Sequence, residues 1–375
     1  MPRGRLGAAI ERRVREAVRS GRLRPGARLP STRVLAADLG VSRSVVVQAY
    51  EQLAAEGYLT TRPGAAARVG DVRPAGRAGP ERGNGDGVTR AATPPPDGGP
   101  QGWDVDFRPG SPHLGSLPRR DWERAVRRAL VTLTDAEMGY GDARGLPRLR
   151  EALADYLGRV RGAVVDPADL VVVNGFAQGL AVVGRMLLGA GRPVAGVEDP
   201  GSVHTTEHLA AQGLDTVPVP VDTGGVDVDA LDPAAATRLG ALLVTPAHQF
   251  PTGTVLAPER RRAVVAWAER ADGLVVEDDY DAEYRYDHHP VGAVQGTAPD
   301  RVVLGGSTSK TLAPGLRLGW LAVPPALAAE AAHHKHHLDL MTPVLEQAAL
   351  AELVTSGRYE RHVRRSRARY RRRRD

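Results

Sequence analysis

The spacing of apolar residues divides the chain into two parts with different periodicities. Over residues 1–70, apolar residues recur every three or four positions, as at Ile10, Val14 and Val18, which predicts short amphipathic helices. From residue 103 to residue 375, short runs of Val and Leu alternate with longer helical patterns. This alternation predicts an α/β domain with a mainly parallel central sheet.

A segment of unusual composition separates these two parts. Gly or Pro occupies 14 of the 32 positions between residues 71 and 102, and large apolar residues are almost absent there. Such a composition is typical of a flexible linker. The expected organisation is therefore a domain of residues 1–70, a linker of residues 71–102 and a domain of residues 103–375.

The N-terminal part has the pattern of a helix-turn-helix followed by a β-hairpin. Ser31 and Ser42 each precede a helical apolar pattern, so both are expected to cap helices, which a turn at Gly40 connects. Two short β-type segments then flank the turn at Pro63-Gly64, which is the pattern of a wing. A small three-helix domain that binds another protein is the alternative interpretation.

Two strand ends in the body carry candidate cofactor chemistry. The apolar run 171–173 leads through Asn174-Gly175 into a helix, whose free backbone N–H groups suit a phosphate. The apolar run 274–276 leads into several acids that include Asp278, and a carboxylate at a strand end can keep a pyridine nitrogen protonated. A helix cap or a metal-binding cluster would also explain these acids.

Lys310 is the third candidate and follows the apolar run 302–304. All but two of the 50 basic residues are Arg, and Lys310 and Lys335 are the exceptions. Lys can form an imine whereas Arg cannot, although a single Lys that escaped a compositional bias would look the same. Together with the phosphate cradle, Asp278 and the cation Arg317, Lys310 supplies the parts that pyridoxal phosphate requires.

Charge and composition restrict the class of protein further. Residues 1–70 hold 13 Arg and only 5 acidic residues, which favours a polyanionic partner such as DNA. The chain has no Cys and no run of about 18 apolar residues, so we expect a cytoplasmic protein without disulfides or membrane spans. We expect no metal site, and we interpret the His-rich run 333–337 as a solvated helix face.

The N-terminal motifs resemble the winged helix-turn-helix of the GntR regulators. These motifs are Arg-Leu-Pro-Ser-Thr-Arg, Leu-Gly-Val-Ser-Arg, Ala-Tyr-Glu-Gln-Leu and Glu-Gly-Tyr-Leu. Ala66 and Ala67 stand where the wing of the family commonly has Gly and Thr. The resemblance implies that DNA is contacted by four residues of the helix-turn-helix, namely Arg33, Ser42, Arg43 and Ser44.

The whole chain resembles the MocR subfamily of the GntR regulators, in which this domain precedes a fold-type I aminotransferase-like domain. The motifs that carry the resemblance are Tyr-Gly-Asp-Ala-Arg-Gly, Glu-Asp-Pro-Gly, Thr-Pro-Ala-His-Gln-Phe-Pro-Thr-Gly, Glu-Asp-Asp-Tyr-Asp and Ser-Thr-Ser-Lys. The resemblance implies that Lys310 holds pyridoxal phosphate as an internal aldimine, that Asp278 pairs with its ring nitrogen and that Tyr280 binds its ring hydroxyl. It also implies that the phosphate lies among the backbone of Ala177 and Gln178 and the side chains of Ser307, Ser309 and Arg317.

Four positions qualify this resemblance. Tyr140 and His248 correspond to positions near the family's cofactor pocket, but core packing explains them equally well. Ser202 replaces a Tyr that can stack on the cofactor ring in relatives, so we expect either a lower affinity for the cofactor or stacking by another ring such as Phe176. We also expect the C-terminal subdomain to be incomplete, because the helical pattern that begins at Arg358 runs to Asp375.

Three functions follow from these features. The first is a homodimeric transcription regulator that binds operator DNA and senses pyridoxal phosphate or its aldimine with an amine or amino acid. The second is a pyridoxal phosphate-dependent aminotransferase with an accessory DNA-binding domain. The third is a truncated product without function.

Overall fold

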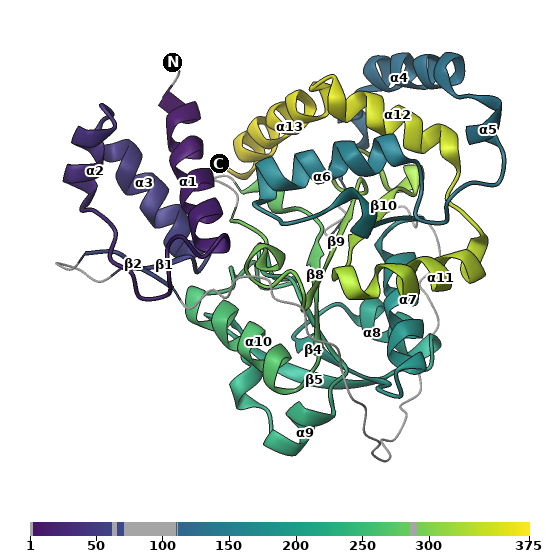
Figure 1. Ribbon diagram of the computed structural model, residues 1–375. Coiled ribbons are helices and arrows are strands. Elements are labelled where there is room, and N and C mark those ends of the chain that lie inside the picture. The colour runs from purple at the N-terminus through teal and green to yellow at the C-terminus, as the bar shows by residue number, and fades with distance from the viewer. Residues whose placement is uncertain (1–2, 62–65, 71–109, 111, 286–290) are drawn as a thin grey trace.

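The computed structural model describes residues 3–61, 66–70, 110, 112–285 and 291–375. The N-terminal domain lies beside the larger body and contacts it (Figure 1). The predicted linker and the predicted turn of the wing at Pro63-Gly64 lie outside the described residues.

The N-terminal domain has three helices and a two-stranded antiparallel sheet, as predicted. Its core includes Val46, Ala49 and Leu53, which are fully buried. Ser31 caps the second helix through a 3.3 Å hydrogen bond from the Val34 amide to its side-chain oxygen, which confirms that prediction. The elements are α1 (Arg3–Arg19), α2 (Thr32–Asp38), α3 (Arg43–Ala55), β1 (Leu59–Thr60) and β2 (Arg68–Val69).

The body is built on an eight-stranded sheet that is mainly parallel, as predicted. The central strands run parallel, β10 is antiparallel to both of its neighbours, and β6 is antiparallel to β5. In spatial order the strands are β3 (Leu170–Val173), β10 (Gly319–Ala322), β9 (Val302–Ser307), β8 (Leu274–Asp279), β7 (Ala241–Val244), β4 (Val194–Asp199), β5 (Asp215–Asp222) and β6 (Gly225–Val226).

Helices cover both faces of this sheet. Side chains alternate between the faces of a strand, so Leu170 and Val172 of β3 pack on one side while Val171 and Val173 pack on the other. The α-helices are α4 (Arg119–Thr132), α5 (Asp135–Met138), α6 (Pro147–Arg161), α7 (Phe176–Gly189), α8 (Val203–Ala211), α9 (Pro233–Arg238), α10 (Pro258–Arg270), α11 (Ala328–Asp339), α12 (Val344–Thr355) and α13 (Arg358–Arg374). Short 3₁₀ helices span Leu114–Ser116, Pro167–Asp169, Val228–Ala230, Ala282–Tyr284, Val294–Thr297, Pro314–Leu316 and Pro325–Leu327.

Local sequence explains where α6 begins and ends. Pro147 stands at its first turn, where a missing N–H costs no hydrogen bond. Gly162 ends the helix in the left-handed conformation, with φ of 63°. None of the helices in the described part of the chain is long and apolar enough to cross a membrane.

Candidate cofactor site and DNA-binding surface

The ends of β8 and β9 bring Asp278 and Lys310 into one site. The two strands are parallel, and Asp278 lies opposite Gly305, shortly before Lys310. Burial and neighbouring carboxylates, first that of Asp279, raise the pKa of Asp278 to about 8, while the ammonium group of Lys310 acts to lower it. The predicted acid and the predicted amine are therefore close enough to interact.

The surroundings of Asp278 suit a flat cationic ring. No described residue donates a hydrogen bond to its carboxyl group, and Lys310 acts on it only through its charge. The ring of Phe176 covers the neighbouring strand so closely that a Cβ on Gly305 would lie 2.2 Å from it. A protonated ring nitrogen would supply the missing cation, and Phe176 lies near enough to contact such a ring.

Hydrogen bonds of Lys310 and of the following residue, Thr311, hold Lys310 in position. Its Nζ donates a 2.6 Å hydrogen bond to the carbonyl oxygen of Gly110. The buried Thr311 hydroxyl accepts a 2.8 Å bond from Tyr359, and the Thr311 carbonyl accepts a 2.7 Å bond from Nε2 of His362. Helix α13 thus fixes the loop that carries Lys310.

Arg317 lies at the predicted phosphate cradle. Its Nη2 donates a 2.6 Å bond to the carbonyl of Asn174, and a Cβ on Gly175 would lie only 2.9 Å from the same atom. Gly175 also has φ of 80°, so this position requires Gly. Ser307 and Ser309 lie at the end of β9 and are joined by a 3.3 Å bond from the Ser309 amide to the Ser307 hydroxyl.

The first turn of α7 offers two free amide groups to an anion. The amides of Phe176 and Ala177 have no hydrogen-bond partner among the described residues, as is usual in the first turn of a helix. The amide of Gln178 donates to the carbonyl of Gly175 at 3.1 Å, and its side chain points to Asp339. Of the two residues expected to bind phosphate through the backbone, Ala177 therefore has its amide available.

Tyr280 and His248 lie beside the acidic end of β8. The Tyr280 hydroxyl donates a 2.8 Å bond to the carbonyl of His248, and its oxygen keeps lone pairs that can accept another bond. Nδ1 of His248 lies 2.9 Å from the Asp281 carboxylate. This hydrogen bond raises the pKa of His248.

Tyr140 and Ser202 both lie in surroundings that the sequence did not indicate. Tyr140 is 92% exposed, so packing in the core of this chain does not explain it. Ser202 begins α8, where its side-chain oxygen accepts a 3.3 Å hydrogen bond from the amide of Thr205. Ser202 therefore acts as a helix cap.

The His-rich run forms the end of α11, and one prediction about it was wrong. His333, His336 and His337 are exposed as expected, but Lys335 is fully buried. The apolar face of the helix could not be read from residues 333–337, because polar residues occupy every position of this run. No group of three potential ligands that could hold a metal ion occurs among the residues the structure describes.

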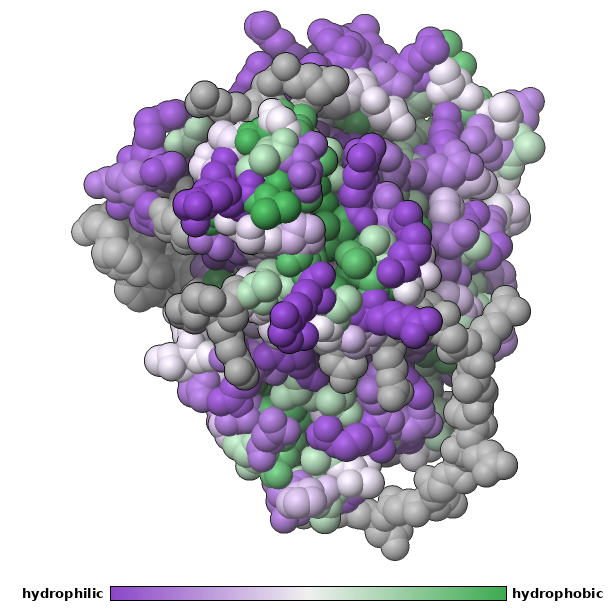
Figure 2. Space-filling view, turned by 60° about the vertical axis from the view of Figure 1, so that its left-hand side comes forward, coloured by the Kyte–Doolittle hydropathy of each residue, from purple (hydrophilic) through white to green (hydrophobic). Residues whose placement is uncertain are grey.

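The four predicted DNA contacts lie on one exposed part of the N-terminal domain. Arg33, Ser42, Arg43 and Ser44 are all exposed, and Nε of Arg43 contacts the hydroxyl of Thr32 at 3.4 Å. Ser42 stands at the N-cap position of α3, but its hydroxyl bonds to that of Ser44 at 3.0 Å and does not cap the helix. In Figure 2, hydrophilic residues surround a central group of hydrophobic residues on this face of the molecule.

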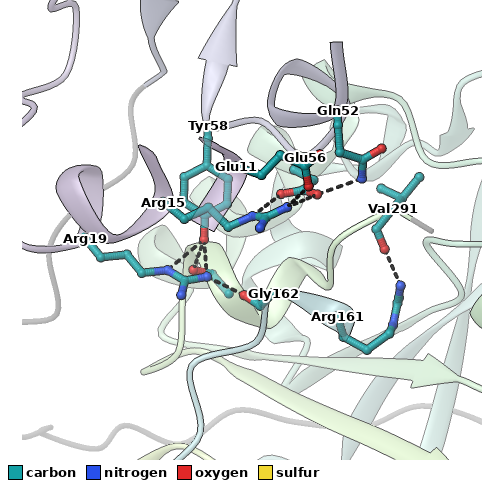
Figure 3. A network of polar contacts seen from close by, with 10 residues as sticks. Glu11, Arg15, Arg19, Gln52, Glu56, Tyr58, Arg161, Gly162 and Val291 are labelled. Atoms are coloured by element: carbon teal, nitrogen blue, oxygen red, sulfur yellow. Dashed lines mark hydrogen bonds and ion pairs between the residues drawn. The ribbon is translucent and has the colours of Figure 1, made fainter. Parts of the chain in front are cut away.

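A contact between the N-terminal domain and the body was not apparent from the sequence. The guanidinium group of Arg19 donates to the Tyr58 hydroxyl, at 2.9 and 2.6 Å, and to the carbonyl of Gly162 (Figure 3). The Tyr58 hydroxyl donates in turn to the carbonyl of Gly296. Two carbonyls of the body therefore accept hydrogen bonds from the DNA-binding domain.

The same contact includes a buried ion pair. Arg15 makes two 2.7 Å hydrogen bonds to Glu56, which is 2% exposed (Figure 3). A Cβ on Gly292 would lie 2.7 Å from the Glu56 carboxyl carbon, and one on Gly162 would lie 3.3 Å from the Arg15 side chain. Glycine in the body is therefore needed for the close approach of the two domains.

The contacted segments of the body are bound to β8. The carboxylate of Glu277 accepts 3.0 Å bonds from the amides of Val294 and Gln295. Arg161 bonds to Asp279 at 2.6 and 3.1 Å; burial alone would lower its pKa, but attraction to Asp279 raises it overall. Both residues that flank Asp278 thus hold the surface on which the DNA-binding domain lies.

The fold and the site define an aminotransferase-like domain joined to a winged DNA-binding domain. Residues 113–375 match the model of the family "Aminotransferase class I and II", and residues 6–69 match that of "Bacterial regulatory proteins, gntR family". The chain is 35% identical to the probable rhizopine catabolism regulatory protein MocR of Rhizobium meliloti, over 96% of this chain and 73% of that protein. It is 36% identical to the pyridoxine biosynthesis transcriptional regulator PdxR of Corynebacterium glutamicum, over 97% of this chain and 76% of that protein.

The chain belongs to the MocR-type GntR transcriptional regulators. Solved aminotransferases share the fold of its body. The kynurenine aminotransferase of Pyrococcus horikoshii has a TM-score of 0.65 and 27% identity, and the alignment covers 71% of this chain and 67% of that chain. The α-aminoadipate aminotransferase LysN of Thermus thermophilus has a TM-score of 0.62 and 25% identity, with 70% and 67% covered. Aminotransferases of this fold depend on pyridoxal phosphate.

Proposed function

We propose that this regulator binds operator DNA through its winged domain and changes that binding when its body holds pyridoxal phosphate. A cytoplasmic homodimer, each subunit with one winged domain, would match a DNA site with two similar halves. The exposed positions of Arg33 and Arg43 support the DNA-binding part of this proposal. Arg suits both phosphate and guanine, because its planar guanidinium group donates parallel hydrogen bonds.

The residues present fit the cofactor. Lys310 would hold it covalently, Asp278 would pair with its ring nitrogen, and Arg317 with the first turn of α7 would bind its phosphate. When bound, the cofactor supplies an aldehyde carbon that primary amines attack. Tyr280 would bind the ring hydroxyl. The raised pKa of Asp278 supports its role, because a carboxylate in these acidic surroundings gains most from a cationic partner.

The effector that suits this site is an amine or an amino acid. With the cofactor bound, a primary amine would compete with Nζ of Lys310 for this carbon, and the proton given up by the incoming ammonium group would pass to the displaced lysine amine. The freed ammonium group of Lys310 can then bond to the carbonyl of Gly110, as it does in this structure. Exchange at Lys310 would therefore change which groups contact the segment before α4.

The observation that carries the proposal is the arrangement on the two sides of β8. Asp278 lies at the proposed cofactor site, whereas Glu277 and Asp279 bind the segments that contact the DNA-binding domain. A shift of the strand end on cofactor binding would therefore move the carbonyls of Gly162 and Gly296. Those carbonyls accept the hydrogen bonds from the winged domain, which links the two functions physically.

Exposed apolar residues near α4 support the homodimer. Leu130, Val131 and Met138 are 60%, 80% and 60% exposed, and Tyr140 follows closely in the sequence. A group of exposed large apolar side chains favours contact with another protein surface. A second copy of this chain would cover this group and would account for the exposure of Tyr140.

An aminotransferase is the second candidate function, because Lys310, Asp278 and Arg317 would also suit an enzyme that uses this cofactor. One titration separates the two. Pyridoxal phosphate should give the wild-type protein a visible absorbance band that Lys310→Ala and Lys310→Arg both lack. Amino acids are then added to the loaded protein. A change in DNA affinity without formation of pyridoxamine phosphate supports the regulator, whereas turnover with an unchanged DNA affinity supports the enzyme. No band in the wild type would overturn both.

A further inference from the structure

Lys335 is the second of the two lysines in the chain, and its side chain is fully buried in α11. Its ammonium group pairs with the carboxylate of Asp339, one helical turn later. A buried charge without a partner is strongly destabilising, so the carboxylate is needed to keep the lysine charged. Burial lowers the pKa of Lys335, and the hydrogen bond to Asp339 opposes that effect.

Asp339 also binds the segment that forms the phosphate cradle. Its second oxygen accepts hydrogen bonds from the side-chain amides of Asn174 and Gln178, both at 2.7 Å. The side-chain oxygen of Gln178 accepts a 2.8 Å bond from the backbone amide of Asn174. One carboxylate therefore fixes both the turn before α7 and the first turn of that helix.

The cradle itself depends on the position of Asn174. Its carbonyl accepts the hydrogen bond from Arg317, and Gly175 follows directly. If Asn174 moved, the free amides of α7 and the guanidinium group of Arg317 would no longer point to one place. Donors that are already fixed in place bind an anion more tightly than mobile donors, because less conformational freedom is lost on binding.

The charge of Lys335 is as important as the hydrogen bonds of Asp339. A bare carboxylate close to the cradle would repel a phosphate, and the buried ammonium group neutralises it. A compact ammonium group fits a fully buried position, whereas the larger planar guanidinium of Arg would need more space and more acceptors.

We infer that Lys335 and Asp339 are positioning residues for the phosphate group of the cofactor. Neither residue contacts the phosphate. Asp339 holds the side chains of Asn174 and Gln178 in place, and Lys335 neutralises the charge of Asp339. The inference rests on the proposed binding of pyridoxal phosphate. Lys335 and Asp339 should therefore strengthen binding of the phosphate group and leave binding of the ring and the aldehyde unaffected.

The test compares pyridoxal phosphate with pyridoxal, which has the same ring and aldehyde but no phosphate. Dissociation constants are measured by absorbance titration for the wild type, Lys335→Met and the control Glu330→Gln, an exposed position on the same helix. Lys335→Met should weaken the binding of pyridoxal phosphate about tenfold. It should weaken the binding of pyridoxal less than about twofold, because only the charge-assisted hydrogen bonds to the phosphate are perturbed. Glu330→Gln should change neither.

A double variant provides a check against general damage to the fold. In Lys335→Met with Asp339→Asn, no unpaired charge remains and the new amide can still accept a hydrogen bond. Its affinity for pyridoxal phosphate should therefore recover most of the loss. The inference would be overturned if Lys335→Met lost affinity equally for both ligands or kept its full affinity for pyridoxal phosphate. It would also be overturned if the double variant recovered none of the lost affinity. A wild type that binds neither ligand would instead overturn the proposed function.

Discussion

The Tyr58 hydroxyl of the winged domain donates a hydrogen bond to the carbonyl oxygen of Gly296 in the aminotransferase-like domain. The same hydroxyl accepts from Arg19, which also reaches the body. A phenol buried in this way couples the two domains more specifically than an apolar contact, since its hydrogen bonds are lost when either domain moves.

Removal of this hydroxyl should weaken communication between the domains. In Tyr58→Phe, the carbonyl of Gly296 loses its donor, which costs about 1–3 kcal/mol in the docked arrangement. The ratio of DNA dissociation constants with and without pyridoxal phosphate should therefore move toward 1. Fluorescence anisotropy with a DNA fragment selected from random sequence by the wild-type protein measures this ratio.

Tyr50→Phe is the matched control for that experiment. The Tyr50 hydroxyl donates to the carbonyl of Pro30 within the winged domain and does not reach the body. The wild-type ratio should persist in this variant. A response in Tyr58→Phe as large as that of the wild type would show that the coupling does not pass through this contact.

DNA affinity should depend on Arg43 more than on arginines of the body. Arg43→Ala should weaken binding to the selected DNA by about 1–3 kcal/mol, because Arg43 is exposed at the start of α3 and is free to contact a base or phosphate. Arg127→Ala on α4 removes another exposed charge and should have a much smaller effect. Equal effects of the two substitutions would remove Arg43 from the DNA-binding surface.

The pH dependence of stability should report on Asp278 in the cofactor-free protein. Its pKa of about 8 lies above the value of about 3.9 in an unfolded chain. The folded state therefore holds this proton more tightly, so the contribution of Asp278 to stability is full below pH ~4 and is lost as the pH rises to about 8. The thermal unfolding midpoint should fall less in Asp278→Asn than in the wild type between about pH 5 and pH 8.5.

Asp155→Asn supplies the comparison for that measurement. Asp155 is an exposed acid on α6, so its substitution should leave the pH dependence of the wild type unchanged. Parallel curves for the wild type and Asp278→Asn would mean that Asp278 is not held protonated in the folded protein.

The strand ends that form the candidate cofactor site could be located from sequence, because each joins an apolar run to residues with distinct chemistry. Asp278 and Lys310 follow such runs directly, and parallel strands place their ends at one edge of a sheet. The turn at Gly175 was recognisable for the same reason. Phe176 lies close to Gly305, and its stacking on a cofactor ring stays a prediction.

The contacts between distant segments could not be predicted in this way. Tyr58 and Gly296 meet only because two domains fold and dock, and neither residue has a local pattern that indicates the other. The burial of Lys335 was hidden because its neighbours in sequence are all His. The role of Asp339 depends on the packing of α11 against α7, which no spacing along the chain reveals.

The most direct test of the account measures DNA affinity with and without pyridoxal phosphate, in the wild type and in Lys310→Ala. Absorbance should be recorded on the same samples to establish that the wild type holds the cofactor. We expect pyridoxal phosphate to change the DNA dissociation constant of the wild type and to leave that of Lys310→Ala unchanged. Identical DNA affinities for the loaded and unloaded wild type would contradict it.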